Sequence, residues 1–253
     1  MFFQQLFSAG IGLTIFIMAL ILGKKNRSAT DYVLVFWLLV FSLYLISILL
    51  LNSNQQEFEL YEFLMLEFTE ASIFLHGPIL FLYTQSLTDF SFRIKLKQIF
   101  HFVPFMASFV FLVLLLFKEG QQANVYRDLL LIGKMTSLLI YSLISLKLLH
   151  FHKNNVKDIF SNTERKYLSW LSIIVWGILS IWIIAVTSLS LDRFSDIQIP
   201  QYGGMFTNIS VCILIFVMGY FGVRQPSLFF DYKEKTSPLA KRKGKISEIR
   251  AIL

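Results

Sequence analysis

Seven apolar runs, each about as long as a helix that crosses a bilayer, dominate this chain and limit what it can fold into. The runs lie near 5–23, 32–52, 70–88, 100–117, 129–149, 167–190 and 204–223. Hydrophobic residues make up 56% of the chain and charged residues only 15%. The sequence therefore predicts an all-α integral membrane protein, with a seven-helix transmembrane bundle over 1–223 and a basic cytoplasmic tail over 224–253.

The distribution of basic residues predicts how the bundle is oriented. The loops 24–31, 89–99 and 147–166, together with the tail, hold 19 of the 23 Lys and Arg residues, whereas the alternate loops hold three. Basic residues in short loops remain cytoplasmic. We therefore expect the N-terminus outside and the C-terminus in the cytoplasm.

The loop before the third run is acidic. Segment 53–70 contains no base and five glutamates: Glu57, Glu59, Glu62, Glu67 and Glu70. Apolar side chains recur there at helical spacing, at Phe58, Tyr61, Met65 and Phe68. This pattern predicts that the third span begins as an amphipathic extension at the outer surface.

The tail contains a cluster of basic residues, namely Lys241, Arg242, Lys243 and Lys245. We expect this cluster to contact anionic lipids of the inner leaflet. Direct contact with nucleic acid is the alternative. A helix-turn-helix domain does not fit into a tail of this length, so no DNA contact is expected from this chain as it stands.

The third run contains a His-Gly-Pro sequence at 76–78. Pro78 has no N–H for the carbonyl of Phe74 and predicts a helix kink, while Gly77 permits close approach of a neighbouring helix. His76 either takes part in the local repair or bonds across to another helix.

Polar residues of four runs are expected at a similar depth in the outer half of the bundle. They are Glu70, His76, Lys134, Thr187, Ser188, Asn208 and Ser210. An ammonium group in hydrocarbon needs a partner, so we expect Lys134 to point inward or to reach Glu70 or Glu67. The residues predict an outward-facing ligand pocket; a structural ion pair with ordinary interhelical hydrogen bonds is the alternative.

Several kinds of chemistry find no support in the sequence. The last run has no lysine for a retinal Schiff base, and the four histidines are not spaced as metal ligands. Common hydrolase, metalloprotease, phosphate-loop and kinase motifs are absent from the sequence. We therefore expect no enzyme, no cofactor and no bound metal.

Three strings occur in the order HGPILFLYTQSL (76–87), FHFVPF (100–105) and GYFGVRQPSLF (219–229). Together they resemble the membrane-embedded sensor half of bacterial AraC-type transcriptional regulators. In that group a helical membrane domain of seven or eight spans precedes a cytoplasmic DNA-binding domain with two helix-turn-helix units. The matching positions are Gly77-Pro78, Tyr83-Thr84, Pro104 and Arg224-Gln225-Pro226.

The resemblance implies a signal-sensing domain in the bacterial inner membrane, truncated before its DNA-binding domain, with 231–253 as the linker. It also implies a small ligand or an envelope condition as the signal, and a homodimer once a DNA-binding domain is attached. Two other functions stay open on the residues alone. They are a small-solute transporter and a stand-alone membrane protein that assembles with a partner.

Overall fold

The structure, a computed structural model, describes residues 2–25, 27–51, 60–89, 92–115, 121–156, 169–194 and 202–224, and all of the regular structure in these ranges is helical. The α-helices are α1 (Phe2–Leu22), α2 (Ala29–Leu51), α3 (Leu60–Thr88), α4 (Val103–Leu115), α5 (Gln121–Val156), α7 (Ser169–Phe194) and α8 (Tyr202–Arg224). A 3₁₀-helix, η1 (Leu96–Phe102), leads directly into α4. The predicted all-α class is confirmed.

Five stretches of the described residues are long and apolar enough to cross a membrane. They are Gln4–Leu22, Ala29–Leu50, Met65–Thr88, Leu96–Val113 and Leu129–His152. In α7 and α8 the apolar stretches with described side chains are shorter, Trp170–Ala185 and Asn208–Tyr220, although the helices themselves contain 26 and 23 residues. The architecture is that of a multi-pass membrane protein.

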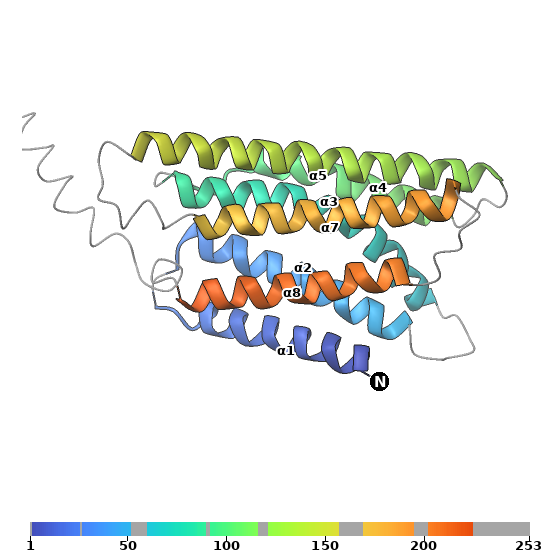
Figure 1. The fold of residues 1–253 in the computed structure, drawn as a ribbon, viewed down its shortest axis with the longest axis horizontal. Helices are drawn as coiled ribbons and strands as arrows, with labels where there is room; N and C mark the ends of the chain where they lie inside the picture. The colour runs from blue at the N-terminus through green and yellow to red at the C-terminus, as the bar shows by residue number, and fades with distance from the viewer. Residues whose placement is uncertain are drawn as a thin grey trace, which may run out of the picture.

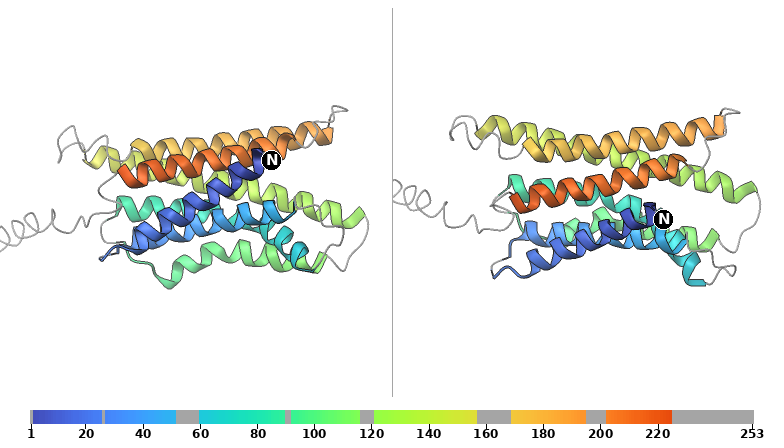
Figure 2. Two further views of the ribbon diagram at one scale, coloured as in Figure 1. Left: turned by 90° about the horizontal axis from the view of Figure 1, so that it is seen from below. Right: turned by 60° about the horizontal axis from the view of Figure 1, so that its bottom comes forward.

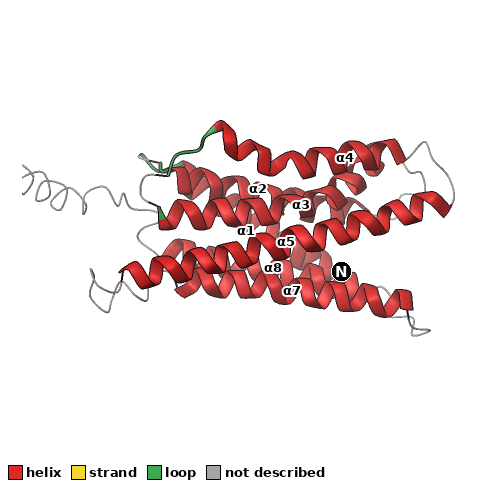
Figure 3. Ribbon diagram, turned by 90° about the horizontal axis from the view of Figure 1, so that it is seen from above, coloured by secondary structure: helices red, strands yellow, loops and turns green. Residues whose placement is uncertain are grey.

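The helices lie side by side along the long axis of the molecule and alternate in direction (Figure 1). Six of them close a ring in the order α1, α2, α3, α5, α7, α8, and α8 returns to α1 (Figure 2). Helix α4 packs on α3 and lies at the edge of the bundle (Figure 3). The C-terminal ends of α1, α3, α5 and α8 share one end of the molecule (Figure 1), which we call the basic end because Lys24, Lys25, Arg93, Lys95 and Lys97 lie in its loops and in η1.

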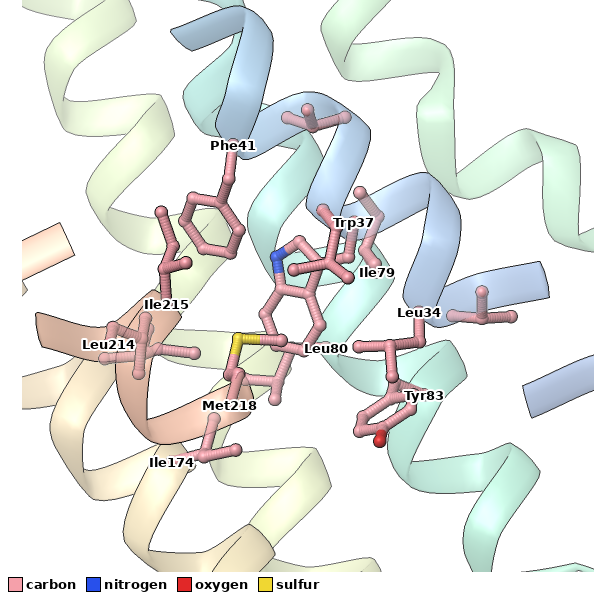
Figure 4. Packing of buried hydrophobic residues seen from close by; sticks show 14 of the residues in the cluster. Leu34, Trp37, Phe41, Ile79, Leu80, Tyr83, Ile174, Leu214, Ile215 and Met218 are labelled. Carbon is pink, nitrogen blue, oxygen red and sulfur yellow. The ribbon is translucent and has the colours of Figure 1, made fainter. Parts of the chain in front are cut away.

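The interior of the ring is filled by large apolar side chains. Trp37, Leu38, Leu80 and Ile215 have no exposed surface. Around Trp37, side chains of α2, α3, α7 and α8 converge (Figure 4). Burial of this kind leaves few gaps and fixes how the helices face one another.

Helix α3 begins ten residues before the apolar run that predicted it, at Leu60. The predicted extension is therefore present as helix, but from Met65 onward it packs into the bundle and does not lie on its surface. Glu67 is completely buried, Met65 accepts a hydrogen bond from Ser47 at 3.7 Å, and Phe68 contacts Phe105 edge to face. The acidic composition of 53–70 gave no sign of this packing.

The fourth span also begins earlier than predicted, as the 3₁₀-helix η1. Pro104 has no N–H with which to bond the carbonyl of Phe100 in α-helical fashion. The N–H of Val103 donates to that carbonyl instead, three residues away. The proline thus accounts for the change of helix type at the start of α4.

Candidate functional site

An ion pair joins α3 to α5 in the half of the bundle away from the basic end. The Lys134 ammonium donates to Oε2 of Glu70 at 2.5 Å. The lysine side chain is only 4% exposed, whereas that of Glu70 is 43% exposed. The predicted pairing of Lys134 with a glutamate is therefore confirmed. The carboxylate of that glutamate, Glu70, remains accessible from outside the bundle.

A second polar contact joins α2 to α8. The hydroxyl of Tyr44 donates to Oδ1 of Asn208 at 2.6 Å. Glu67 lies one helical turn from Glu70 and is buried. We call the five residues Tyr44, Glu67, Glu70, Lys134 and Asn208 the polar layer. Its two contacts join α3 to α5 and α2 to α8.

His76 contacts side chains of α2, which contributed no residue to the predicted ligand pocket. The indole N–H of Trp37 donates to Nδ1 of His76 at 3.2 Å, and the ring of Phe41 stacks on the imidazole with centroids 4.8 Å apart. Because Nδ1 accepts, a neutral His76 carries its proton on Nε2. Of the two roles open to His76, the structure shows the bond across to another helix, α2.

Gly77 allows α5 to approach α3 closely, as predicted. A Cβ atom at this position would lie 2.9 Å from Cδ2 of Tyr141. The Tyr141 hydroxyl in turn bonds Nδ1 of His101 in η1 at 2.8 Å. Helix α3 continues through Pro78 to Thr88. The Gly-Pro pair therefore lies where α3, α5 and η1 are joined.

Replacing Gly77 by alanine is expected to lower the free energy of unfolding by about 1–3 kcal/mol, because the Tyr141 ring has to move. Thermal or SDS-induced unfolding in detergent measures this change. Gly12→Ala is the matched control, since nothing lies within 4 Å of a Cβ added there. A stability loss for Gly77→Ala no larger than that of the control would contradict the close approach.

Of the other predicted pocket residues, Thr187 and Ser210 have described side chains. Thr187 is exposed and its hydroxyl donates to the carbonyl of Ile183 within α7 at 2.7 Å. Ser210 is half-buried on α8, two residues beyond Asn208. The side chain of Ser188 and the whole basic cluster Lys241, Arg242, Lys243 and Lys245 lie outside the described residues.

Two residues of α2 that the sequence analysis missed take part in the polar contacts, Trp37 and Tyr44. A signal for them exists in the sequence. Trp37, Phe41 and Tyr44 are spaced four and three residues apart, so they share one face of a helix. All three face inward, two of them toward His76 and one toward Asn208.

The chemistry available to the polar layer is that of recognition by charge and hydrogen bonds. It offers a carboxylate that is partly exposed, an ammonium that is buried, and a phenol bonded to a carboxamide. Among the residues with described side chains, no three His, Cys, Asp or Glu residues are grouped as a metal site. Lys134 bonds Oε2 of Glu70, and a carboxylate can accept further hydrogen bonds, so a ligand could share Glu70 with Lys134.

Comparison with known proteins identifies no relative: no protein-family model, no curated protein and no solved structure matches the chain.

Proposed function

We propose that this chain is the transmembrane signal-sensing domain of a membrane-bound AraC-type transcriptional regulator. In this proposal all seven apolar runs span the bacterial inner membrane. The N-terminus is outside, the polar layer lies in the outer half, and the basic end faces the cytoplasm. The lengths of α7 and α8, 26 and 23 residues, are sufficient for the sixth and seventh spans.

One observation carries the proposal: the Tyr44–Asn208 hydrogen bond ties α2 to α8, the last helix in the part of the chain that the structure describes. Helix α8 runs from this bond to Arg224 at the basic end, where the string that resembles the family's exit to its linker is found. A change at Tyr44 can thereby act through Asn208 on the helix that leads toward the basic end.

The positions of the other two resembling strings also support the proposal. HGPILFLYTQSL forms the part of α3 that contacts α2 through His76 and α5 through Gly77. FHFVPF forms the junction of η1 and α4. Each string thus lies where helices meet.

The transporter alternative is less well supported. A solute path needs polar lining along the length of the bundle. Around Trp37, the space between α2, α3, α7 and α8 is occupied by apolar side chains, including Leu80, Ile174 and Ile215 (Figure 4). These apolar side chains separate the polar layer from the basic end.

The DNA that follows the Leu253 codon tests the proposal directly. The sequence in all three forward frames should encode an AraC-type domain with two helix-turn-helix units, in frame or displaced by a frameshift. If no such domain is encoded there, this chain is not the sensor half of a regulator, and flux measurements in liposomes become the next experiment.

Coupling through α8 gives a second test. When an AraC-type DNA-binding domain is fused after Leu253, Asn208→Leu is expected to change transcription from its target promoter at least about fivefold, in the range of ordinary coupling energies. The change is expected because the bond to Tyr44 is lost. Reporter enzyme activity in whole cells measures it, with protein abundance checked by immunoblot.

Ile213→Ala is the control for this experiment, because Ile213 lies on the same helix and is exposed. Equal reporter activity for Asn208→Leu, Ile213→Ala and the parent fusion would contradict coupling through α8. Transcription from the parent fusion also requires a cytoplasmic C-terminus, so a fusion that is inserted but inactive would count against the proposed orientation.

A further inference from the structure

The segment 92–102 combines two kinds of side chain that rarely share an exposed surface. Three of its residues are basic, Arg93, Lys95 and Lys97, and it contains no acidic residue. Four large apolar side chains alternate with them and are exposed: Ile94 at 57%, Leu96 at 81%, Ile99 at 57% and Phe100 at 74%. We call 92–102 the interfacial segment.

The geometry of η1 explains this exposure. A 3₁₀-helix has about three residues per turn, so residues three apart share a face. The face with Gln98 and His101 is partly buried, whereas Leu96 and Ile99 lie on a second face and Lys97 and Phe100 on a third, all four exposed. Basic and apolar groups are therefore presented together.

The segment is fastened to the bundle at both ends. At the first end Phe92 packs against the core, and its backbone N–H donates to the carbonyl of Asp89 at 3.0 Å. At the other end Phe102 contacts Phe36 of α2 edge to face, and His101 bonds Tyr141 of α5. The exposed faces consequently keep a fixed orientation relative to the bundle.

We infer that the interfacial segment is a binding surface for anionic phospholipids, in which Arg93, Lys95 and Lys97 contact headgroup phosphates and Leu96, Ile99 and Phe100 contact acyl chains. Phosphate attracts this group of cations, and the neighbouring apolar side chains are stabilised only where acyl chains cover them. A nucleic acid would satisfy the cations but leave four large apolar groups in water.

The position of the segment agrees with this ligand. It follows α3 at the basic end and leads into α4 at the edge of the bundle (Figure 3), a place open to the surrounding lipid. The inference requires that the chain lies in a bilayer, as proposed above, and does not depend on any role in transcription.

The test uses the full chain purified in detergent and supplied with equal amounts of phosphatidylglycerol and phosphatidylcholine. Native mass spectrometry counts the lipids that stay bound. The parent chain should retain phosphatidylglycerol in preference to phosphatidylcholine. In the triple variant R93Q/K95Q/K97Q the ratio of retained phosphatidylglycerol to phosphatidylcholine should fall at least about fivefold, since each basic residue contributes to attraction by an anionic surface.

The triple variant K241Q/R242Q/K243Q is the matched control, since it removes the same charge from the tail. The loss of preference for phosphatidylglycerol in this control should be less than half of the loss in R93Q/K95Q/K97Q. Retention of the full preference by R93Q/K95Q/K97Q, or equal loss in both variants, overturns the inference. So does complete displacement of phosphatidylglycerol by soluble glycerophosphate, because the headgroup alone would then be the ligand.

Two further measurements separate folding and acyl contact from charge. The unfolding temperature in pure phosphatidylcholine should be the same for the parent chain and R93Q/K95Q/K97Q, because the three side chains are exposed. Leu96→Ser with Phe100→Ser should also weaken retention of phosphatidylglycerol, although the charge is unchanged. Undiminished retention in this double variant contradicts a lipid surface. Because none of these readouts involves transcription, their failure leaves the regulator proposal standing.

Discussion

Replacing Asp31 by alanine is expected to lower the free energy of unfolding by about 3–5 kcal/mol, the cost of breaking a buried ion pair from one side. Asp31 is 1% exposed. Its carboxylate accepts from the Lys24 ammonium at 3.1 and 3.2 Å, and from the backbone N–H and hydroxyl of Ser28 at 2.7 and 2.8 Å. Alanine removes the carboxylate that accepts these four hydrogen bonds.

This expectation can be checked by SDS-induced unfolding in mixed micelles, with Lys25→Ala as the control in the same turn. Lys25 is exposed, so its loss should cost well under about 1 kcal/mol. Asn in place of Asp31 keeps part of the hydrogen bonding and should give an intermediate value. A loss below about 1 kcal/mol for Asp31→Ala would show that the turn between α1 and α2 is not fixed by this carboxylate.

The second large effect is expected at Glu70, where alanine should also cost about 3–5 kcal/mol, because it leaves the Lys134 ammonium buried without its partner. The reverse substitution, Lys134→Ala, should cost less, about 1–2 kcal/mol. The reason is the difference in exposure, 43% for Glu70 against 4% for Lys134. When Lys134 is removed, the Glu70 carboxylate loses its partner but is still partly exposed outside the bundle.

The variant E70M/K134M should recover most of the stability lost in Glu70→Ala, since two apolar residues of similar size replace a buried pair. Equal costs for Glu70→Ala and Lys134→Ala would contradict the asymmetry. Glu67 supplies another control. If Lys134 turned to Glu67 when Glu70 is absent, Glu67→Gln in the Glu70→Ala background would add a further large loss.

The sequence predicted the helices well because each of them has to satisfy its backbone within the apolar run that forms it. The predicted run 32–52 corresponds to α2, Ala29–Leu51, and 204–223 corresponds to α8, Tyr202–Arg224. A pairing of Lys134 with Glu70 or Glu67 was also predictable, since a buried ammonium needs a carboxylate at its own depth, and the structure shows Glu70.

The choice of lateral partners was not predictable in the same way. The sequence pattern predicts a similar depth in the bundle for His76 and Asn208, but the structure shows His76 bonded to Trp37 and Asn208 bonded to Tyr44. These contacts depend on how the helices are arranged: α2 lies beside α3 in the ring and also contacts α8, which is two places away in the ring. Apolar runs determine length and depth, and they contain little information on that order.

The junction of η1 and α4 has a consequence for the thickness of the bilayer that this span can match. Alone, the 13 residues of α4 rise about 20 Å, too little for a hydrocarbon core of about 30 Å. The seven residues of η1, at about 2 Å each, extend the combined span to about 33 Å. This length exceeds that of the core, so the start of η1, with Lys97, reaches the headgroup region while α4 lies in the hydrocarbon. The 3₁₀ geometry beside Pro104 thus lengthens the fourth span without adding residues to it.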